Sequence, residues 1–428
     1  MKKAWSRRTI DRLENGIIVL LVCSALFLVY QSGLVQNFAG QGAGTSGESV
    51  FTGVQNTALS RGTPVRLMVQ LDDGRYGAQY DQTLVDQLYA SGLSELLTDS
   101  IEAMESPRTV TQEVWQQAIA QSGPWVFYDF LYNVSFTAQS GQGEGAARFF
   151  LLTTRGGRAD VVYYYNEETG DYYAGQIQDA TLTLPASLDG LQPNGGQFVF
   201  EVPELAQVLA PYGILLDQPP TTTVYTAANP VASWGEAERT ALLDALDFNT
   251  RALTIYESAD GTVMQEGSDT LRIQEEGKII YHASDSSQAR FQALSQREKD
   301  LQIKAEEVLD LVTAGQLGEG RMFCQSIETL EDETVELTFC YLLDGAQVQL
   351  GEEGWGAQFV FSDSALTSFT ICLRTYTATD RTQRALPERQ AAAAVTALGQ
   401  TGKELQLCYR DDDTTPEITA DWTVRERS

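Results

Sequence analysis

Histidine is almost absent from this chain, since His282 is the only one among 428 residues. A zinc site built from two or three imidazole ligands is therefore excluded. A serine or cysteine hydrolase would have to use this one ring as its general base, and no G-x-S-x-G nucleophile motif occurs. We interpret His282 as an ordinary residue near the end of a strand.

Cysteine is also scarce. Cys23 lies in a long apolar segment, and the other four cysteines fall in the last third of the chain, at Cys324, Cys340, Cys372 and Cys408. None forms a C-x-x-C motif, and gaps of 16, 32 and 36 positions are poor spacing for structural zinc. Small buried residues on strands are favoured over a disulfide, although four thiols permit three pairings.

Basic residues are outnumbered, because 29 Lys and Arg stand against 58 Asp and Glu, for a formal net charge of −29. This acidity disfavours nucleic acid as a partner. Gly141 to Gly145 lacks the strand and helix of a phosphate-binding loop. The acidic runs Asp72–Gly74 and Asp411–Asp413 lack the oxygen pattern of a calcium loop, so we expect solvated turns. We predict no cofactor, no metal ligand and no catalytic residue.

Charge is absent from one stretch of about twenty residues, Gly16 to Val35, which reads GIIVLLVCSALFLVYQSGLV. It is long enough to cross a bilayer as one helix. Five basic and two acidic residues precede it, which places the N-terminus in the cytoplasm. The run is too long for a signal-peptide core, and no A-x-A-like site follows it directly. We therefore expect an uncleaved single-pass anchor in the cell membrane with an extracytoplasmic ectodomain.

The membrane segment carries a stripe of small and weakly polar residues. Gly16, Cys23, Ser24 and Gln31 fall at offsets of 7, 8 and 15 positions, close to one side of a helix. Such stripes permit close contact between helices in lipid, which makes these four residues a candidate partner-binding surface. Because there is no clean G-x-x-x-G, an inert anchor stays an open alternative.

Composition and periodicity divide the chain into five segments. They are a basic cytoplasmic tail (1–15), the membrane helix (16–35), a flexible Gly- and Ser-rich tether (36–50), an N-terminal α+β region (51–250) and C-terminal α+β lobes (251–428). Predicted strands and helices do not alternate along the chain, so we do not expect a parallel sheet. We expect an α+β, multi-lobed ectodomain of antiparallel sheets with packed helices.

Apolar residues at three- and four-residue steps predict the helices, and period-two patterns predict the strands. Two helices are expected to start at capping boxes. The predicted helices are Gln82–Met104, Thr109–Gln121 (box Thr109 and Gln112), one after the box Ser233 and Glu236, Arg297–Ala314 and Pro387–Leu398. The predicted strands include Trp125–Thr137, Ala147–Thr154, Asp160–Asn166, Tyr172–Gln178, Gln197–Val202, Leu271–Gln274, Lys278–His282, Val335–Leu342, Glu404–Tyr409 and Ile418–Arg425.

Tyrosines gather at one predicted hairpin. Tyr163 and Tyr165 on one strand, and Tyr172 and Tyr173 on the next, would place rings on both faces of the sheet. Cross-strand aromatic packing is the favoured interpretation. An exposed aromatic platform for a glycan or a protein partner is the alternative.

The stretches LTIYESADGTV from Leu253 and DTLRIQEEGKIIYH from Asp269, with the closing Asp421-Trp422-Thr423-Val424, resemble the YycH and YycI family of membrane-anchored regulators in low-GC Gram-positive bacteria. The likeness is greater to YycH-type members. It covers about the last two fifths of the chain, and the rest only by its layout of basic N-terminus, one span and α+β ectodomain.

The resemblance implies a non-enzymatic role. Members associate, largely through the membrane helix, with an essential sensor histidine kinase of a two-component system that controls cell-wall metabolism. The implied partners are this kinase, a paralogous single-span regulator and the membrane. A cell-surface module that binds a glycan or peptide is the second interpretation. A membrane-anchored hydrolase that uses paired carboxylates, which needs no histidine, is the third.

Overall fold

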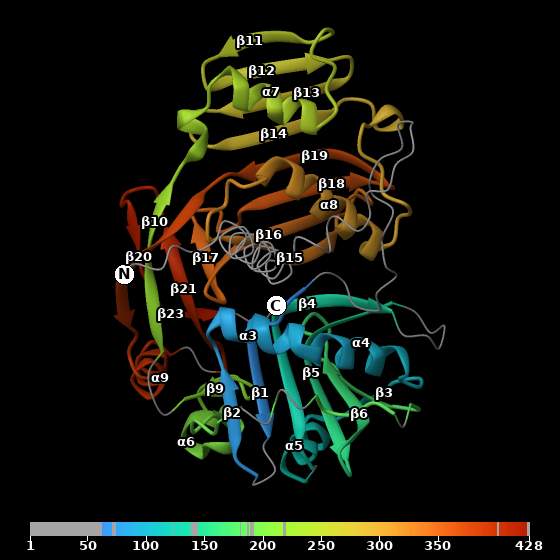
Figure 1. Ribbon diagram of the computed structural model, residues 1–428, viewed down its shortest axis with the longest axis vertical. Coiled ribbons are helices and arrows are strands. Elements are labelled where there is room, and N and C mark those ends of the chain that lie inside the picture. The colour runs from blue at the N-terminus through green and yellow to red at the C-terminus, as the bar shows by residue number, and fades with distance from the viewer. Residues whose placement is uncertain are drawn as a thin grey trace, which may run out of the picture. The chain divides into compact units, whose positions relative to one another are not determined.

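The computed structural model describes residues 62–425 apart from 71–73, 122, 138–143, 180, 186–187, 189–191, 217–219 and 400–401. The chain divides into two units between Asn56 and Thr57, and every described residue belongs to the second. This unit is a mixed α+β structure that is rich in sheet, as the sequence predicts (Figure 1).

The first sheet has seven strands in the order β2-β1-β4-β5-β6-β7-β3, and every pair of neighbours is antiparallel. Its strands are β1 (Arg66–Gln70), β2 (Tyr76–Gln79), β3 (Arg108–Val110), β4 (Trp125–Thr137), β5 (Glu144–Arg155), β6 (Arg158–Tyr165) and β7 (Tyr172–Gln176). The tight turn between Arg155 and Arg158 enforces the antiparallel pairing of β5 with β6.

Helices cover both faces of this sheet, which explains why β4 is buried along most of its length and carries only one charged residue, Asp129. Tyr128 packs in the same core as Leu97, and the preceding residue, Phe127, packs on the other face with Trp115. The helices are α3 (Gln82–Leu88), the π-helical turn η1 (Tyr89–Leu93) and α4 (Ser94–Glu102) on one face, and α5 (Gln112–Gln121) on the other.

Two of the helices predicted in this region differ in the structure. The predicted helix Gln82–Met104 is interrupted at Gly92, which has φ +121° and so leaves the right-handed helical region. The second helix does not begin with a capping box at Thr109, because Thr109 pairs with Tyr173 in the sheet and the helix starts at Gln112. Pairing with β7 has overridden the local capping signal.

A connecting region leads from the first sheet to the second. It holds β8 (Gln197–Phe198), the 3-10 turn η3 (Val199–Glu201), α6 (Pro203–Ala206) and β9 (Ile214–Leu215). A three-stranded sheet follows in the order β20-β10-β22, made of β10 (Thr221–Ala228), β20 (Thr375–Arg384) and β22 (Glu417–Ile418). The predicted strand Gln197–Val202 is therefore only two residues long.

The second large sheet has eleven strands. The main path is β11-β12-β13-β14-β19-β18-β16-β17-β21-β23, and β15 pairs with β16. The bounds are β11 (Thr254–Ser258), β12 (Gly261–Glu266), β13 (Asp269–Gln274), β14 (Lys278–Ala283), β15 (Arg321–Thr329), β16 (Val335–Leu343), β17 (Ala346–Leu350), β18 (Ala357–Ser362), β19 (Ala365–Cys372), β21 (Glu404–Asp411) and β23 (Ala420–Arg425). β17 and β21 pair in parallel, which the sequence did not predict.

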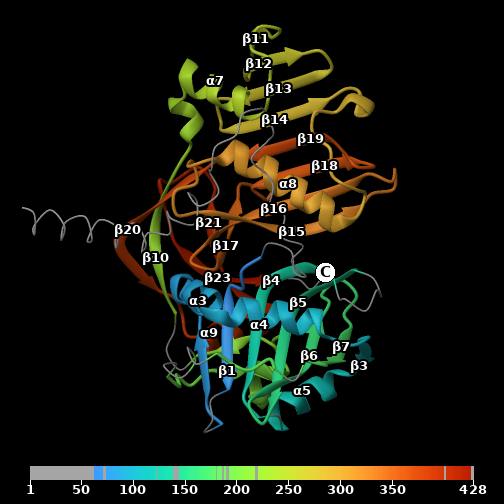
Figure 2. The same cartoon turned by 45° about the vertical axis from the view of Figure 1, so that its right-hand side comes forward.

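Most of this sheet is built from one unit used twice. A helix and four strands, α7 (Glu236–Ala245) with β11 to β14, are followed by α8 (Glu298–Thr313) with β15, β16, β18 and β19. β14 and β19, the last strand of each unit, pair antiparallel at the centre. From this pair outward, each unit places its strands in order from its last strand to its first. Both helices share one hydrophobic core and lie on one face of the sheet (Figures 1 and 2).

The sequence predicts these helices well, with one correction. Leu301, Ala305 and Val308 of α8 are buried in the shared core, as their spacing indicates. α7 does not start with Ser233 as its cap; Glu238 instead accepts a hydrogen bond from the backbone N–H of Gly235 at 2.8 Å. α7 lies before the predicted boundary at 250, yet it packs with strands that follow that boundary.

The last helix, α9 (Glu388–Ala397), matches the predicted span closely. Its Ala392 and Val395 pack against Val199, Leu205 and Leu209 of the connecting region. The final strands β21 and β23 follow α9. The contact between α9 and the connecting region therefore places the end of the chain against a segment from its first half.

Candidate functional site

The predicted membrane stripe, Gly16, Cys23, Ser24 and Gln31, lies outside the described residues. Within the part of the chain that the structure describes, no helix is long and apolar enough to cross a membrane. The membrane topology therefore stays a prediction from the sequence.

The tyrosine hairpin is packed on both sides. Tyr165 and Tyr172 are only 4% and 8% exposed, and their ring centroids lie 4.7 Å apart. On the other face, Tyr173 stacks on Tyr164 at 4.8 Å. Tyr163 is half-buried and meets Trp115 edge-on. The alternative of an exposed platform is thus wrong for Tyr165 and Tyr172, because Trp115 of α5 and Tyr212 cover that face.

The four described cysteines are free thiols on strands, as favoured from the sequence. Burial raises the pKa of Cys340 to about 12 and that of Cys372 to about 11, so neither thiol is activated as a nucleophile. His282 is exposed on β14 opposite Thr270 and Ser368. Among the described residues, no group of three or more His, Cys, Asp or Glu side chains could hold a metal ion.

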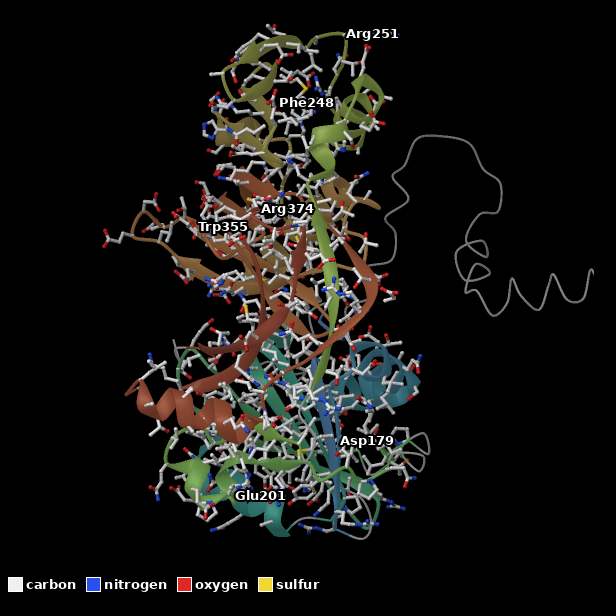
Figure 3. The ribbon with its side chains drawn as sticks, turned by 90° about the vertical axis from the view of Figure 1, so that its left-hand side faces the viewer. Asp179, Glu201, Phe248, Arg251, Trp355 and Arg374 are labelled. Atoms are coloured by element: carbon white, nitrogen blue, oxygen red, sulfur yellow. The ribbon has the colours of Figure 1, made fainter. Side chains whose placement is uncertain are left out.

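The acidic run Asp411–Asp413 differs from the predicted solvated turn. Asp411 is 2% exposed, accepts a hydrogen bond from the Tyr376 hydroxyl at 3.0 Å and lies 3.5 Å from the Arg374 guanidinium. Arg374 also pairs with Asp413, and it lines a surface cavity together with Trp355 (Figure 3). Only the end of this run is solvated, since β21 extends to Asp411.

Arg148 on β5 is the centre of a buried ionic cluster. The residue is 1% exposed, and its guanidinium forms a bidentate pair with Glu404, with Nη1–Oε2 and Nη2–Oε1 distances of 2.5 and 2.6 Å. Its Nε lies 3.1 Å from Asp129 Oδ1, and Nη1 lies 2.8 Å from Glu167 Oε1. Charge-assisted bidentate bonds of this kind are among the strongest in proteins.

Two further arginines balance the charge of the cluster. Arg66 Nη2 lies 2.6 Å from Asp129 Oδ2 and 3.1 Å from Glu404 Oε1. Arg425 Nη2 lies 2.9 Å from Glu167 Oε2. Three guanidinium groups thus meet three carboxylates, and the cluster can be buried without net charge.

The cluster joins the closing strands to the first sheet. Glu404 and Arg425 face each other across β21 and β23, whereas Asp129 and Arg148 face the same space from β4 and β5. Leu131, in an irregularity of β4, takes a left-handed φ of +72° and accepts a hydrogen bond from Arg425 Nη1 at 2.6 Å. Such strain costs about 1–2 kcal/mol, which the surrounding contacts offset.

The electrostatics of Glu404 follow from this geometry. Burial alone would raise the pKa of its carboxyl, but the ion pairs with Arg148, Arg66 and Arg425 outweigh burial and hold the pKa well below its ordinary value. Because every carboxylate of the cluster is held by arginine, the arrangement serves to bind segments together. The sequence signal for it was a single charge inside an apolar strand, in WVFYDFLY for Asp129 and in ARFFLL for Arg148.

A cavity of about 240 Å³ lies beside this cluster. Arg66 and Glu404 belong both to the cluster and to the cavity wall. Most of the rest of the wall comes from the residues that follow β2, from β9, the start of β10 and the turn before β17, and from α9, β21 and β23. Its polar members include Tyr80, Asp81, Asp344, Glu388 and Gln406.

β11 is an outermost strand of the eleven-stranded sheet. It pairs only with β12 among the described strands, so one side of its backbone is left without a strand partner (Figure 1). Ile255 is 58% exposed and Tyr256 is 49% exposed on this strand. An edge with exposed apolar side chains is a site at which another chain can add a strand or dock.

We predict that Glu404→Gln lowers the free energy of unfolding of the full chain by about 3–5 kcal/mol near neutral pH, because it leaves buried arginines without their counter-charge. The folded-state pKa of Glu404 is depressed, so its stabilisation is present above the unfolded value of about 4.5 and is lost as the pH falls below it. The difference between wild type and variant should narrow in acid. Denaturant unfolding between pH 7 and pH 3 measures it.

The matched control is Glu168→Gln, at an exposed position next to Glu167. It should change stability by no more than about 0.5 kcal/mol. A difference between wild type and Glu404→Gln that stays constant with pH would contradict the role given to this carboxylate.

Comparisons with known proteins add no relative. No protein-family model matches the chain. No curated protein and no solved structure matches it either.

Proposed function

We propose that this chain is a non-enzymatic, membrane-anchored regulator that associates with a sensor histidine kinase of a two-component system in cell-wall control. The association uses the membrane helix, 16–35, and the ectodomain outside the membrane. The chain resembles the YycH and YycI regulators, and this role is the one that such a resemblance implies.

The position of β11 carries the part of the proposal that concerns the ectodomain. The first stretch of the resemblance, LTIYESADGTV, forms the edge strand β11 and the first half of its neighbour β12, and the second forms the hairpin of β13 and β14. Ile255 and Tyr256 are therefore both in the stretch that resembles the regulators and exposed on a free sheet edge. We infer that the kinase contacts this edge.

A regulator of this kind works by binding two signalling states of the kinase with unequal affinity. If the edge of β11 and the membrane helix bind one signalling state of the kinase better than the other, the chain shifts the kinase toward that state in proportion to the difference. The buried cluster around Arg148 supports this role, because it holds the first sheet and the closing strands as one body that can transmit a contact.

Replacement of residues 16–35 by an unrelated leucine-rich helix of equal length should abolish co-purification of the kinase, because the stripe of Gly16, Cys23, Ser24 and Gln31 is removed while the anchor stays. Co-purification from native membranes measures this. Ectodomain folding is the control and should be unchanged. Undiminished association would count against a role for the span.

The double variant Ile255→Lys, Tyr256→Lys should weaken kinase association about tenfold, because both side chains are exposed and would lose their apolar contact with a partner. Quantitative crosslinking in native membranes measures the effect. Leu294→Lys is the matched control, since Leu294 is 86% exposed and lies outside β11. Equal crosslinking of the double variant and the control would reject the edge as the contact.

A further inference from the structure

The cavity beside the ionic cluster contains a buried carboxylate that no cation balances. Glu388 is the first residue of α9 and is 7% exposed. Its carboxylate accepts hydrogen bonds from its own backbone N–H and from that of Leu216, but it forms no ion pair within the described part of the chain. Burial raises the pKa of this carboxyl, and the two backbone hydrogen bonds offset only part of that effect.

The other charged side chains of the wall do not balance the charge of Glu388. Arg66 is the one cationic side chain among the described lining residues, and Asp129 and Glu404 take up its charge. Asp81 caps α3 by accepting the Leu84 N–H at 3.0 Å. Asp344 accepts the Thr223 hydroxyl at 3.0 Å. The wall therefore keeps an excess of negative charge, which disfavours an anion and favours a cation.

Most of the remaining wall is apolar or aromatic, and Thr221, Thr222 and Gln406 are polar residues within it. It includes the side chains of Leu209, Ile214, Leu215, Leu405 and Leu407. Two aromatic side chains in the wall are held in place by hydrogen bonds: the Tyr80 hydroxyl donates to the Ile214 carbonyl at 2.6 Å, and Trp422 Nε1 donates to the Leu386 carbonyl at 2.7 Å. Apolar walls with a few polar groups are typical of ligand sites, and aromatic rings attract organic cations.

We propose that this cavity binds an organic cation, an amine or quaternary ammonium group on a compact apolar body, with its charge paired to Glu388. The apolar body lies among the leucines and beside Tyr80 and Trp422. Because the wall combines Arg66 of β1 and Tyr80, which follows β2, with residues of α9 and β21, the ligand contacts both ends of the ectodomain and stabilises their association.

The test uses the full chain in a neutral maltoside detergent and three compounds of similar shape. Phenethylamine is cationic, 2-phenylethanol is neutral and phenylacetate is anionic. Dissociation constants come from ligand-observed nuclear magnetic resonance. We expect phenethylamine to bind at least tenfold more tightly than 2-phenylethanol, and phenylacetate to bind most weakly. Equal binding of the amine and the alcohol overturns the proposal.

Two variants locate the site. Glu388→Gln should remove the preference for the amine, whereas Glu236→Gln, at the exposed first residue of α7, should leave it unchanged. Leu215→Trp keeps the carboxylate but fills the cavity, and it should weaken binding of both the amine and the alcohol at least tenfold. Thermal midpoints establish that each variant is folded. Amine binding that survives Leu215→Trp, or a preference that survives Glu388→Gln, overturns the proposal.

A last experiment distinguishes a lipid headgroup from a free amine as the source of the ammonium group. Phosphatidylethanolamine is added to the phenethylamine titration in one sample and phosphatidylglycerol in another. Competition by phosphatidylethanolamine alone identifies a lipid headgroup as the ammonium source, and absence of competition identifies a free amine. Competition by phosphatidylglycerol alone contradicts recognition of a cation.

Discussion

The bidentate pair between Arg148 and Glu404 joins residues that are 256 positions apart, and the arrangement of the described chain depends on it. Each charge would be costly to bury alone, since removal of one partner strands the other in a site with almost no solvent. The closing strands β21 and β23 are therefore held on the first sheet. The first sheet also contacts the second sheet at another strand, because the ring centroids of Tyr132 on β4 and Phe323 on β15 lie 5.8 Å apart.

Local patterns made much of the fold predictable, and long-range contacts made the rest unpredictable. The stripe of Leu301, Ala305 and Val308 fixed α8, since helix periodicity is written in neighbouring residues. Nothing local places Glu404 beside Arg148, and the cavity wall likewise draws on segments from residue 65 to residue 422. Thr109 illustrates the conflict directly, because pairing with Tyr173 outweighed its helix-capping signal.

The two helix-and-four-strand units connect the fold to the proposed role. Their antiparallel junction at β14 and β19 makes one continuous sheet and leaves β11 as an outer strand. Ile255 and Tyr256 are thereby exposed at the far edge of the sheet from β21, which belongs to the ionic cluster. A partner bound at β11 and a cation bound beside Glu388 would act on one sheet, and the two sites could be coupled through it.

The regulator proposal is tested most directly in the membrane. Photo-crosslinking groups at Gly16, Ser24 and Gln31 in native cells sample the polar stripe of the span, and one at Val29 samples the opposite side of the same helix, given 100° per residue. The account predicts that the stripe positions capture a sensor histidine kinase and that Val29 does not. Capture without a kinase, or equal capture from Val29, would contradict it.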